Sequence, residues 1–147
     1  MKHEIYQLES DRKLLLFEFS SVGPKGKITK LVQYMETNLN NYYNLGFGDR
    51  DEKTGEINDT VITNNGDSQK VLATVASTVY AFTDKHPDSW IHVKGSNTAR
   101  TRLYRIGITN NLLEIKKDYH VFGLKDDQWH EFRKGNEYQA FLIQRKK

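Results

Sequence analysis

The 147-residue chain contains no cysteine. Disulfides, thiolate zinc sites, iron-sulfur clusters and a cysteine nucleophile are therefore excluded. Such a chain suits a reducing compartment, and we expect a cytoplasmic protein. Its first 19 residues lack the apolar segment and small-residue cleavage site of a secretory signal. No window approaches the roughly 18 apolar residues of a membrane span, so we expect no membrane partner.

Proline is also scarce. The two prolines, Pro24 and Pro87, lie in predicted turns, and no Pro-rich linker, repeat or low-complexity tract marks a domain boundary. A length of 147 residues matches the usual size of one domain. We therefore predict a single domain over residues 1–147.

The excess of positive charge is small. The chain has 22 basic and 19 acidic residues and a formal net charge of +3. This balance permits a polyanionic partner without requiring one, so the distribution of the basic residues matters more than their sum. Aromatic residues form 12% of the chain and supply large side chains for a core, although the hydrophobic fraction is only 37%.

Strand patterns dominate both ends of the sequence. Residues 14–22 and 28–35 flank the turn GPKGK and predict a hairpin, and residues 41–48 and 57–63 flank the polar loop DRDEKTGE and predict a second one. Residues 89–95 resemble a short strand. Near the C-terminus, segments 120–124, 129–132 and 138–144 alternate with polar turns, which indicates a meander.

The central pattern has the period of a helix. Apolar residues recur at helical spacing over residues 67–85, with Asp67 as the expected N-cap and Pro87 just beyond the end. A second helix is expected to begin within residues 94–105. We expect Thr109, Asn110 and Asn111 to interrupt it before residues 112–119, because such residues prefer caps and turns to helix interiors.

These elements predict an α+β fold, a mostly antiparallel sheet with two main helices packed on one face. The predicted core consists of large apolar residues from both strands and helices: Leu15, Phe17, Phe19, Val71, Val75, Val79, Leu103, Ile106, Phe141 and Ile143.

The segment KGSNTARTRLYR, residues 94–105, is the main candidate site. A helix start carries unpaired backbone N–H groups and partial positive charge, so it can bind an anion. We expect Ser96 or Thr98 to be the N-cap. Arginine adds a planar fork that matches phosphate oxygens. The candidate anion or nucleic-acid site comprises Lys94, Gly95, Ser96, Asn97, Thr98, Arg100, Arg102 and Arg105.

Helical geometry divides these arginines. If Ala99, Leu103 and Ile106 form the apolar stripe, Arg100 and Arg102 flank it on opposite sides, and Arg105 lies three residues from Arg102 on the same face. This layout suits an extended polyanion better than a small phosphate. In the structural alternative, the arginine stems cover the core and Ser96 only caps the helix. The P-loop spacing is absent.

Other basic and acidic groups allow further hypotheses. The hairpin lysines Lys25, Lys27 and Lys30 could contact phosphate or merely protect a sheet edge. The loop at residues 49–57 has lysine and threonine where a calcium loop needs an oxygen ligand and glycine, so we read it as a solvated hairpin tip. NNGD, residues 64–67, predicts a turn and helix cap, and its asparagines could join a pocket shared by both helix starts.

The five histidines show no metal-binding spacing, and we expect no metal or other cofactor. If the protein were a metal-independent ribonuclease, His92, His120 or His130 would be the acid or base, with Arg102 or Arg105 stabilising the transition state. A structural or surface role is the alternative for each histidine.

Aromatic side chains offer another possible surface. Tyrosines and both tryptophans could stack on bases if the sheet exposes them: Tyr42, Tyr43, Trp90, Tyr104, Tyr119 and Trp129. The alternative is burial in the core. The basic-Gly-aromatic signature of RRM domains is absent.

Residues 64–108, together with YNLGFGD and VFGL, resemble a family of small bacterial proteins grouped as a domain of unknown function. The most distinctive parts are NNGD before KVLATVA and the segment GSNTARTRLYR. The resemblance implies one intracellular domain and carries no activity, catalytic residue or cofactor.

The local chemistry therefore predicts a non-enzymatic binding module for nucleic acid or another extended polyanion. A small enzyme that processes RNA or a phosphoester is the first alternative. A protein that binds the product of a neighbouring gene, through a sheet edge or an aromatic patch, is the second.

Overall fold

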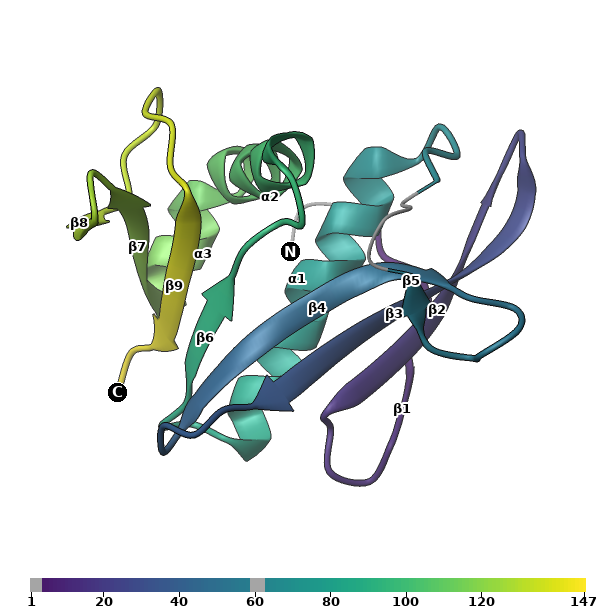
Figure 1. Cartoon of the computed structure of the whole chain (residues 1–147), viewed down its shortest axis with the longest axis horizontal. Coiled ribbons are helices and arrows are strands. Elements are labelled where there is room, and N and C mark those ends of the chain that lie inside the picture. Colours follow the sequence, from purple (N-terminus) through teal and green to yellow (C-terminus); the bar gives the residue numbers. More distant parts are fainter. Residues whose placement is uncertain (1–3, 59–62) are drawn as a thin grey trace. The chain divides into compact units, whose positions relative to one another are not determined.

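The computed structural model describes residues 4–58 and 63–147 and has the predicted α+β fold, with strands that pair mostly antiparallel (Figure 1). Its residues form two compact units. Within the described part of the chain, unit 1 consists of residues 4–35, 46–58 and 63–85, and unit 2 of residues 36–45 and 86–147. The single domain over residues 1–147 stays a prediction.

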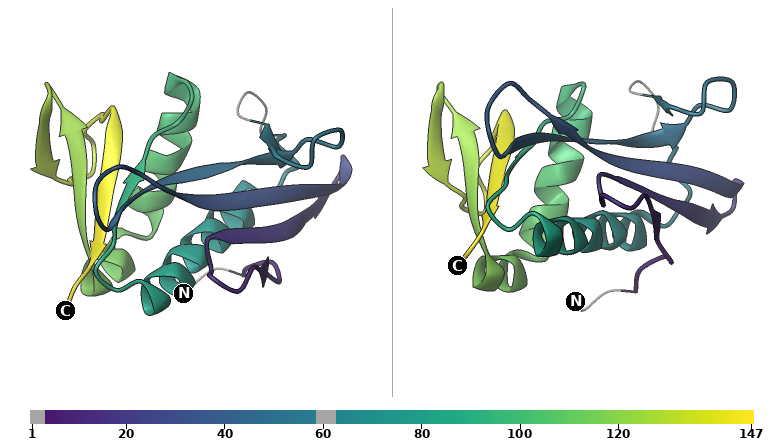
Figure 2. Two further views of the ribbon diagram at one scale, coloured as in Figure 1. Left: turned by 60° about the horizontal axis from the view of Figure 1, so that its bottom comes forward. Right: turned by 90° about the horizontal axis from the view of Figure 1, so that it is seen from below.

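Unit 1 contains strands β1 (Glu9–Ser10), β2 (Leu16–Gly23), β3 (Gly26–Glu36), the second half of β4 (Tyr42–Arg50) and β5 (Ile57–Asn58). Helix α1 (Ser68–Lys85) runs along one face of these strands (Figure 2). The first predicted hairpin is confirmed, because β2 and β3 pair antiparallel with Gly23 opposite Gly26. This pairing leaves Pro24 and Lys25 as a two-residue turn.

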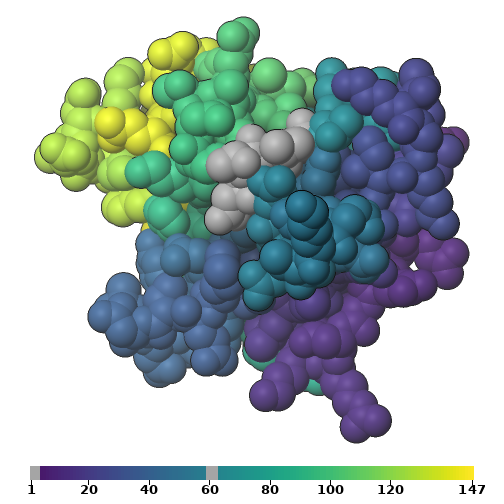
Figure 3. Space-filling view, turned by 45° about the vertical axis from the view of Figure 1, so that its right-hand side comes forward, coloured from purple at the N-terminus to yellow at the C-terminus, as the bar shows by residue number. Residues whose placement is uncertain are grey.

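The second predicted hairpin is also present. Strands β4 and β5 pair antiparallel, and the loop between them lies at the surface (Figure 3). The Asp51 carboxylate accepts hydrogen bonds from the Lys53 and Thr54 amides, at 2.8 and 3.2 Å, and so shapes the loop. The rest of the predicted strand, residues 59–62, lies outside the described residues, as does His3.

Stacked rings fill the core of unit 1. The rings of Tyr34 and Phe82 are 4.1 Å apart and nearly parallel, and the Tyr34 hydroxyl is 2.8 Å from Thr78 Oγ1. Phe17 packs edge-on against Tyr34, and Phe19 stacks on Phe47. The predicted helix over residues 67–85 is confirmed, since its apolar face joins this core.

Polar groups in unit 1 bind one another. The Lys30 ammonium, fully buried, contacts the Asp49 carboxylate and donates to the Thr63 carbonyl at 2.9 Å. The reading of Lys30 as a phosphate contact is therefore wrong, because its charge is buried and paired. Asp67 accepts hydrogen bonds from the Tyr6 and Ser21 hydroxyls.

Unit 2 is built around β6 (Trp90–Val93), which pairs parallel with the first half of β4 and antiparallel with β9 (Ala140–Arg145). Next to β9 lies β7 (Tyr119–Lys125), followed by β8 (Gln128–Glu131), so the predicted meander is confirmed. Asp126 and Asp127 turn the chain between β7 and β8 with φ of 53° and 60°, as a two-residue hairpin turn needs.

Helices α2 (Thr98–Asn110) and α3 (Leu112–Asp118) follow β6. They meet at Asn111, whose side chain donates to the Gly107 carbonyl at 2.9 Å, so the predicted interruption is confirmed. The sequence predicted two main helices, and α3 is a third, short one. None of the helices in the described part of the chain combines the length and apolar character that crossing a membrane requires.

The predicted apolar stripe of α2 is wrong. Ala99 is exposed and Ile106 is 41% exposed, whereas Thr101, Tyr104 and Ile108 are buried at helical spacing. The helix is thus rotated from the expected orientation. Of the ten predicted core residues, six are buried, and Ile106 is on the surface: the buried ones are Phe17, Phe19, Val71, Val75, Phe141 and Ile143.

Candidate functional site

The loop after β6 packs tightly on the first turn of α2. The Gly95 amide donates to the Thr101 hydroxyl at 3.1 Å. A Cβ atom at Gly95 would lie 2.4 Å from the Thr101 nitrogen and 2.5 Å from Arg100 Cβ. Gly95 is therefore needed for the contact between the loop and its own helix, and this contact turns Thr101 inward.

Asn97 is the N-cap of α2. Its side chain accepts a hydrogen bond of 2.9 Å from the Arg100 amide, and its carbonyl accepts one from the Thr101 amide. The prediction of Ser96 or Thr98 as the N-cap is wrong, because Thr98 is already helical and Asn97 has the extended backbone of a cap. Thr98 and Ala99 are exposed, and helix geometry gives their amides no intrahelical acceptor.

A cavity of about 730 Å³ opens at this helix start, and we call it the α2 cavity. It is lined by the loop after β6, one face of α2, and the segments around β8: Lys94, Gly95, Ser96, Asn97, Thr98, Thr101, Arg102, Arg105, Leu124, Asp127, Glu137, Tyr138 and Gln139. All of these belong to unit 2. Its volume lies within the range of small-ligand pockets, roughly 300 to 1,000 Å³.

Seven of the eight predicted site residues line this cavity. Arg102 and Arg105 share it because they lie three residues apart on one helix face. Arg105 is held in place, since its Nη1 donates to the Asn136 carbonyl at 3.2 Å. Among the described residues, neither Arg102 nor Lys94 has a hydrogen-bond or ion-pair partner, and both are exposed.

Arg100 is the exception. It is 8% exposed, it does not line the α2 cavity, and its buried Nη2 has no hydrogen-bond partner among the described residues. The rotation of α2 explains this placement, because the face with Thr101 and Tyr104 turns toward the core and includes Arg100.

Two carboxylates, Asp127 and Glu137, also line the α2 cavity. They lie 17 and 27 residues beyond the end of α2 at Asn110, so the spacing of the helix residues gave no sign of them. The aromatic wall of the cavity is Tyr138, which packs against Phe132 with ring centroids 5.2 Å apart. A Cβ atom at residue 123 would overlap this ring at 2.3 Å, so Gly123 makes room for it.

The chemistry of the α2 cavity is therefore mixed. Lys94, Arg102 and Arg105 can donate to phosphate oxygens, and the partial positive charge of the helix start adds to them. Asp127 and Glu137 can accept hydrogen bonds from hydroxyl or amino groups. No cluster of three or more metal-binding side chains occurs among the described residues.

The histidines proposed as acid or base lie elsewhere. His120 and His130 are exposed, and His92 is half-buried on β6, with Nδ1 3.1 Å from Asn44 Oδ1. Burial, together with the Lys94 charge, lowers the pKa of His92 below its ordinary value. None of these three lines the α2 cavity.

Asn64 and Asn65 are used within unit 1. The Asn65 side chain is buried, donates to the Gly26 carbonyl at 2.8 Å and accepts from the Lys25 amide at 2.7 Å. Asn64 accepts from the Gly66 amide, and Gly66 has a φ of 75°, so the predicted turn is confirmed. The pocket shared by both helix starts stays a prediction.

Comparison with known proteins gives a family and no activity. No curated protein and no solved structure matches the chain. A family model described as a family of unknown function, DUF6934, matches residues 2–146. The chain therefore belongs to the DUF6934 family of unknown function.

Proposed function

We propose that the protein is a binding module for nucleic acid, or for another extended polyanion, and that the α2 cavity holds the phosphate groups. The observation that supports this proposal is the position of Arg102. Its guanidinium lines the cavity next to Lys94 and Arg105 and has no carboxylate partner among the described residues. A cation without a carboxylate partner is available to an incoming anion.

The helix start supports the same proposal. Asn97 caps the Arg100 amide, and the exposed first residues of α2, Thr98 and Ala99, carry amides that can donate to an oxygen ligand. Arg105 is already fixed by the Asn136 carbonyl, so binding would cost less side-chain entropy there than at a free arginine.

The two carboxylates favour nucleic acid over a ligand that carries only negative charge. Asp127 and Glu137 would repel a bare polyphosphate. A nucleotide brings ribose hydroxyls and base amino groups that can donate to these oxygens while its phosphate contacts the arginines. The mixed lining therefore matches a ligand with both kinds of group.

Fluorescence anisotropy with labelled 20-nucleotide single-stranded and duplex probes tests this proposal. We expect binding that weakens steeply as salt increases, because phosphate contacts release counterions. The double variant Arg102→Ala, Arg105→Ala should weaken binding at least tenfold and flatten the salt dependence. Arg12→Ala is the matched control, since Arg12 is an exposed arginine of unit 1. Unchanged affinity in the double variant would overturn the proposal.

A further inference from the structure

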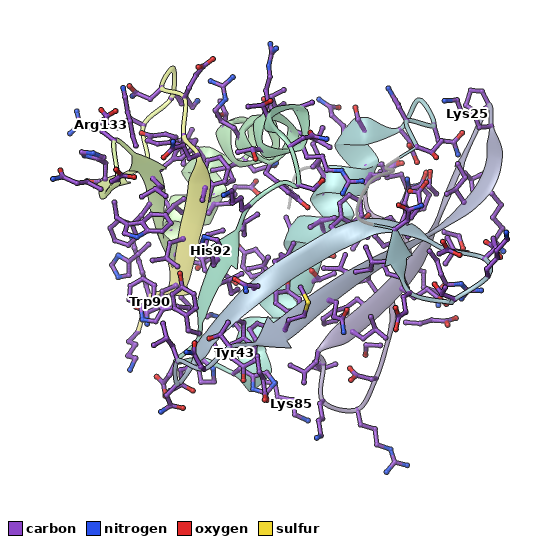
Figure 4. All side chains as sticks on the ribbon, in the orientation of Figure 1. Lys25, Tyr43, Lys85, Trp90, His92 and Arg133 are labelled. Atoms are coloured by element: carbon purple, nitrogen blue, oxygen red, sulfur yellow. The ribbon has the colours of Figure 1, made fainter. Side chains whose placement is uncertain are left out.

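Unit 2 has a second feature, a row of rings on the side of its strands opposite the core. Along β6, Ile91 and Val93 are buried, whereas Trp90 and His92 alternate with them and are half-buried (Figure 4). On β7, Phe122 lies between buried Val121 and Gly123 in the same alternating pattern. Helices α2 and α3 cover the core side of these strands (Figure 1).

Rings from four strands of unit 2 touch across this side. Tyr42 stacks on His92 at 6.1 Å, and His92 meets Trp129 edge-on at 6.0 Å. Trp90 and Phe122 form a second contact at 6.2 Å. We call these five residues the aromatic face. Trp129, on β8, is 40% exposed.

The aromatic face continues into the α2 cavity. Lys94 lines the cavity and follows His92 by two residues. Because side chains alternate along an extended chain, Lys94 and His92 lie on the same side of it at the end of β6. Leu124 lines the cavity as well, and it is the cross-strand partner of Trp129. Lys94 and Leu124 therefore connect the aromatic face to the α2 cavity, which Arg102 and Arg105 line from α2.

The chemistry of the rings is suited to stacking. The lowered pKa of His92 keeps its imidazole neutral near pH 7, and burial raises the pKa of the Tyr42 hydroxyl, which stays protonated. Both residues then offer uncharged π surfaces. The Lys94 ammonium lies close enough to act on His92, so a cation borders the rings, as in proteins that bind single-stranded nucleic acid.

We propose that the aromatic face stacks the unpaired bases of single-stranded nucleic acid while Lys94, Arg102 and Arg105 hold its phosphates. This inference rests on the proposed function and specifies its ligand class. Only unpaired bases can present their flat faces to a protein ring, because the bases of a duplex are stacked on one another. Charge complementarity supports the strand as occupant, since three cations, Lys94, Arg102 and Arg105, outnumber the two carboxylates in the lining of the α2 cavity.

Intrinsic fluorescence offers a direct test, because the two tryptophans of the chain, Trp90 and Trp129, both belong to the aromatic face. A 12-nucleotide oligouridylate should quench this fluorescence to saturation. A duplex of equal length should bind more weakly, and inorganic polyphosphate should leave the fluorescence unchanged. Trp129→Ala should weaken oligouridylate binding about 5- to 150-fold, the range for loss of one stacked base.

Trp129→Phe is the matched variant, because it keeps a ring and should restore most of the affinity. Circular dichroism establishes that both variants fold. Equal binding of duplex and single strand, with Trp129→Ala unaffected and Arg102→Ala, Arg105→Ala weakened, would overturn the stacking inference and leave the proposed function standing. No retention of any nucleic acid would overturn both. Fluorescence that changes on dilution without oligonucleotide would assign the aromatic face to a second copy of the chain instead.

Discussion

The buried charges of unit 1 and the charges beside the α2 cavity of unit 2 have opposite surroundings. In unit 1, Lys30 is buried against Asp49, and Asp67 is bound by the Tyr6 and Ser21 hydroxyls. In unit 2, Lys94 and Arg102 are exposed beside a cavity and have no partner among the described residues. A charge bound within the protein contributes to the fold, and a charge left open can serve a ligand. Whether a lysine or arginine has a partner within the protein, rather than which of the two residues it is, therefore indicates its role.

The largest effect should come from breaking the buried pair of unit 1. Asp49→Ala leaves the Lys30 ammonium buried without its counter-charge, and we expect a loss of about 3–5 kcal/mol in the free energy of unfolding. Urea denaturation measures this loss. The double variant Lys30→Met, Asp49→Leu should lose much less, because no unpaired charge remains. A small loss in Asp49→Ala would show that the pair is not what unit 1 depends on.

The next effect concerns the loop that shapes the α2 cavity. Gly95→Ala places a methyl group 2.4 Å from the Thr101 nitrogen, and backbone atoms there cannot move aside easily. We expect a loss of about 1–3 kcal/mol in the free energy of unfolding, with weaker nucleic-acid binding. Gly55→Ala is the control for binding, because nothing lies within 4 Å of its Cβ position and any loss of stability there comes from backbone strain at its φ of 75°. Equal nucleic-acid binding by both variants would argue against a special role for Gly95.

A smaller effect should follow from removing a carboxylate from the α2 cavity. Asp127→Asn keeps a residue that tolerates the φ of 60° at this turn, so the fold should be unaffected. Polyphosphate binding should tighten by about two- to fivefold, since one repulsive charge is gone. Isothermal titration calorimetry measures this change. Unchanged polyphosphate binding would place the anion away from Asp127.

The smallest effect concerns His92. Its pKa is lowered by burial first and by the Lys94 charge second, so Lys94→Ala should raise it partway and leave it below the ordinary 6.5. Because the unfolded chain binds this proton more readily, the free energy of unfolding should decrease as pH falls through the range below 6.5. The decrease should be smaller in Lys94→Ala. An NMR titration of the imidazole provides the pKa. A His92 pKa that is the same in Lys94→Ala as in the wild-type protein would show that Lys94 does not lie beside the aromatic face.

Local patterns predicted the elements well. Apolar residues at helical spacing gave α1, the two-residue turn at Pro24 and Lys25 gave the first hairpin, and the asparagines at 110 and 111 gave the end of α2. Each of these features depends on neighbouring residues. A short segment of sequence is therefore sufficient to predict each of them.

The candidate site was less predictable. The orientation of α2 depends on the contact between Gly95 and Thr101, and Leu103 beside Tyr104 leaves the apolar face ambiguous. The cavity wall at Glu137 and Tyr138 comes from a distant loop. The sequence also contains the alternation of Trp90 and His92 with Ile91 and Val93, which in a strand places the two rings on one side. Which side the helices would cover depended on packing that the sequence pattern does not encode.

A titration of the ¹⁵N-labelled protein with oligouridylate tests the central claim most directly, because NMR reports every amide and both indole N–H groups at once. We predict shifts at the amides of Lys94, Thr98 and Ala99, at the Arg102 side chain and at the indoles of Trp90 and Trp129, with the amides of unit 1 unchanged. Shifts centred on unit 1, for example at the β2–β3 hairpin with Lys25 and Lys27, or no shifts at saturating oligonucleotide, would contradict the assignment of binding to unit 2.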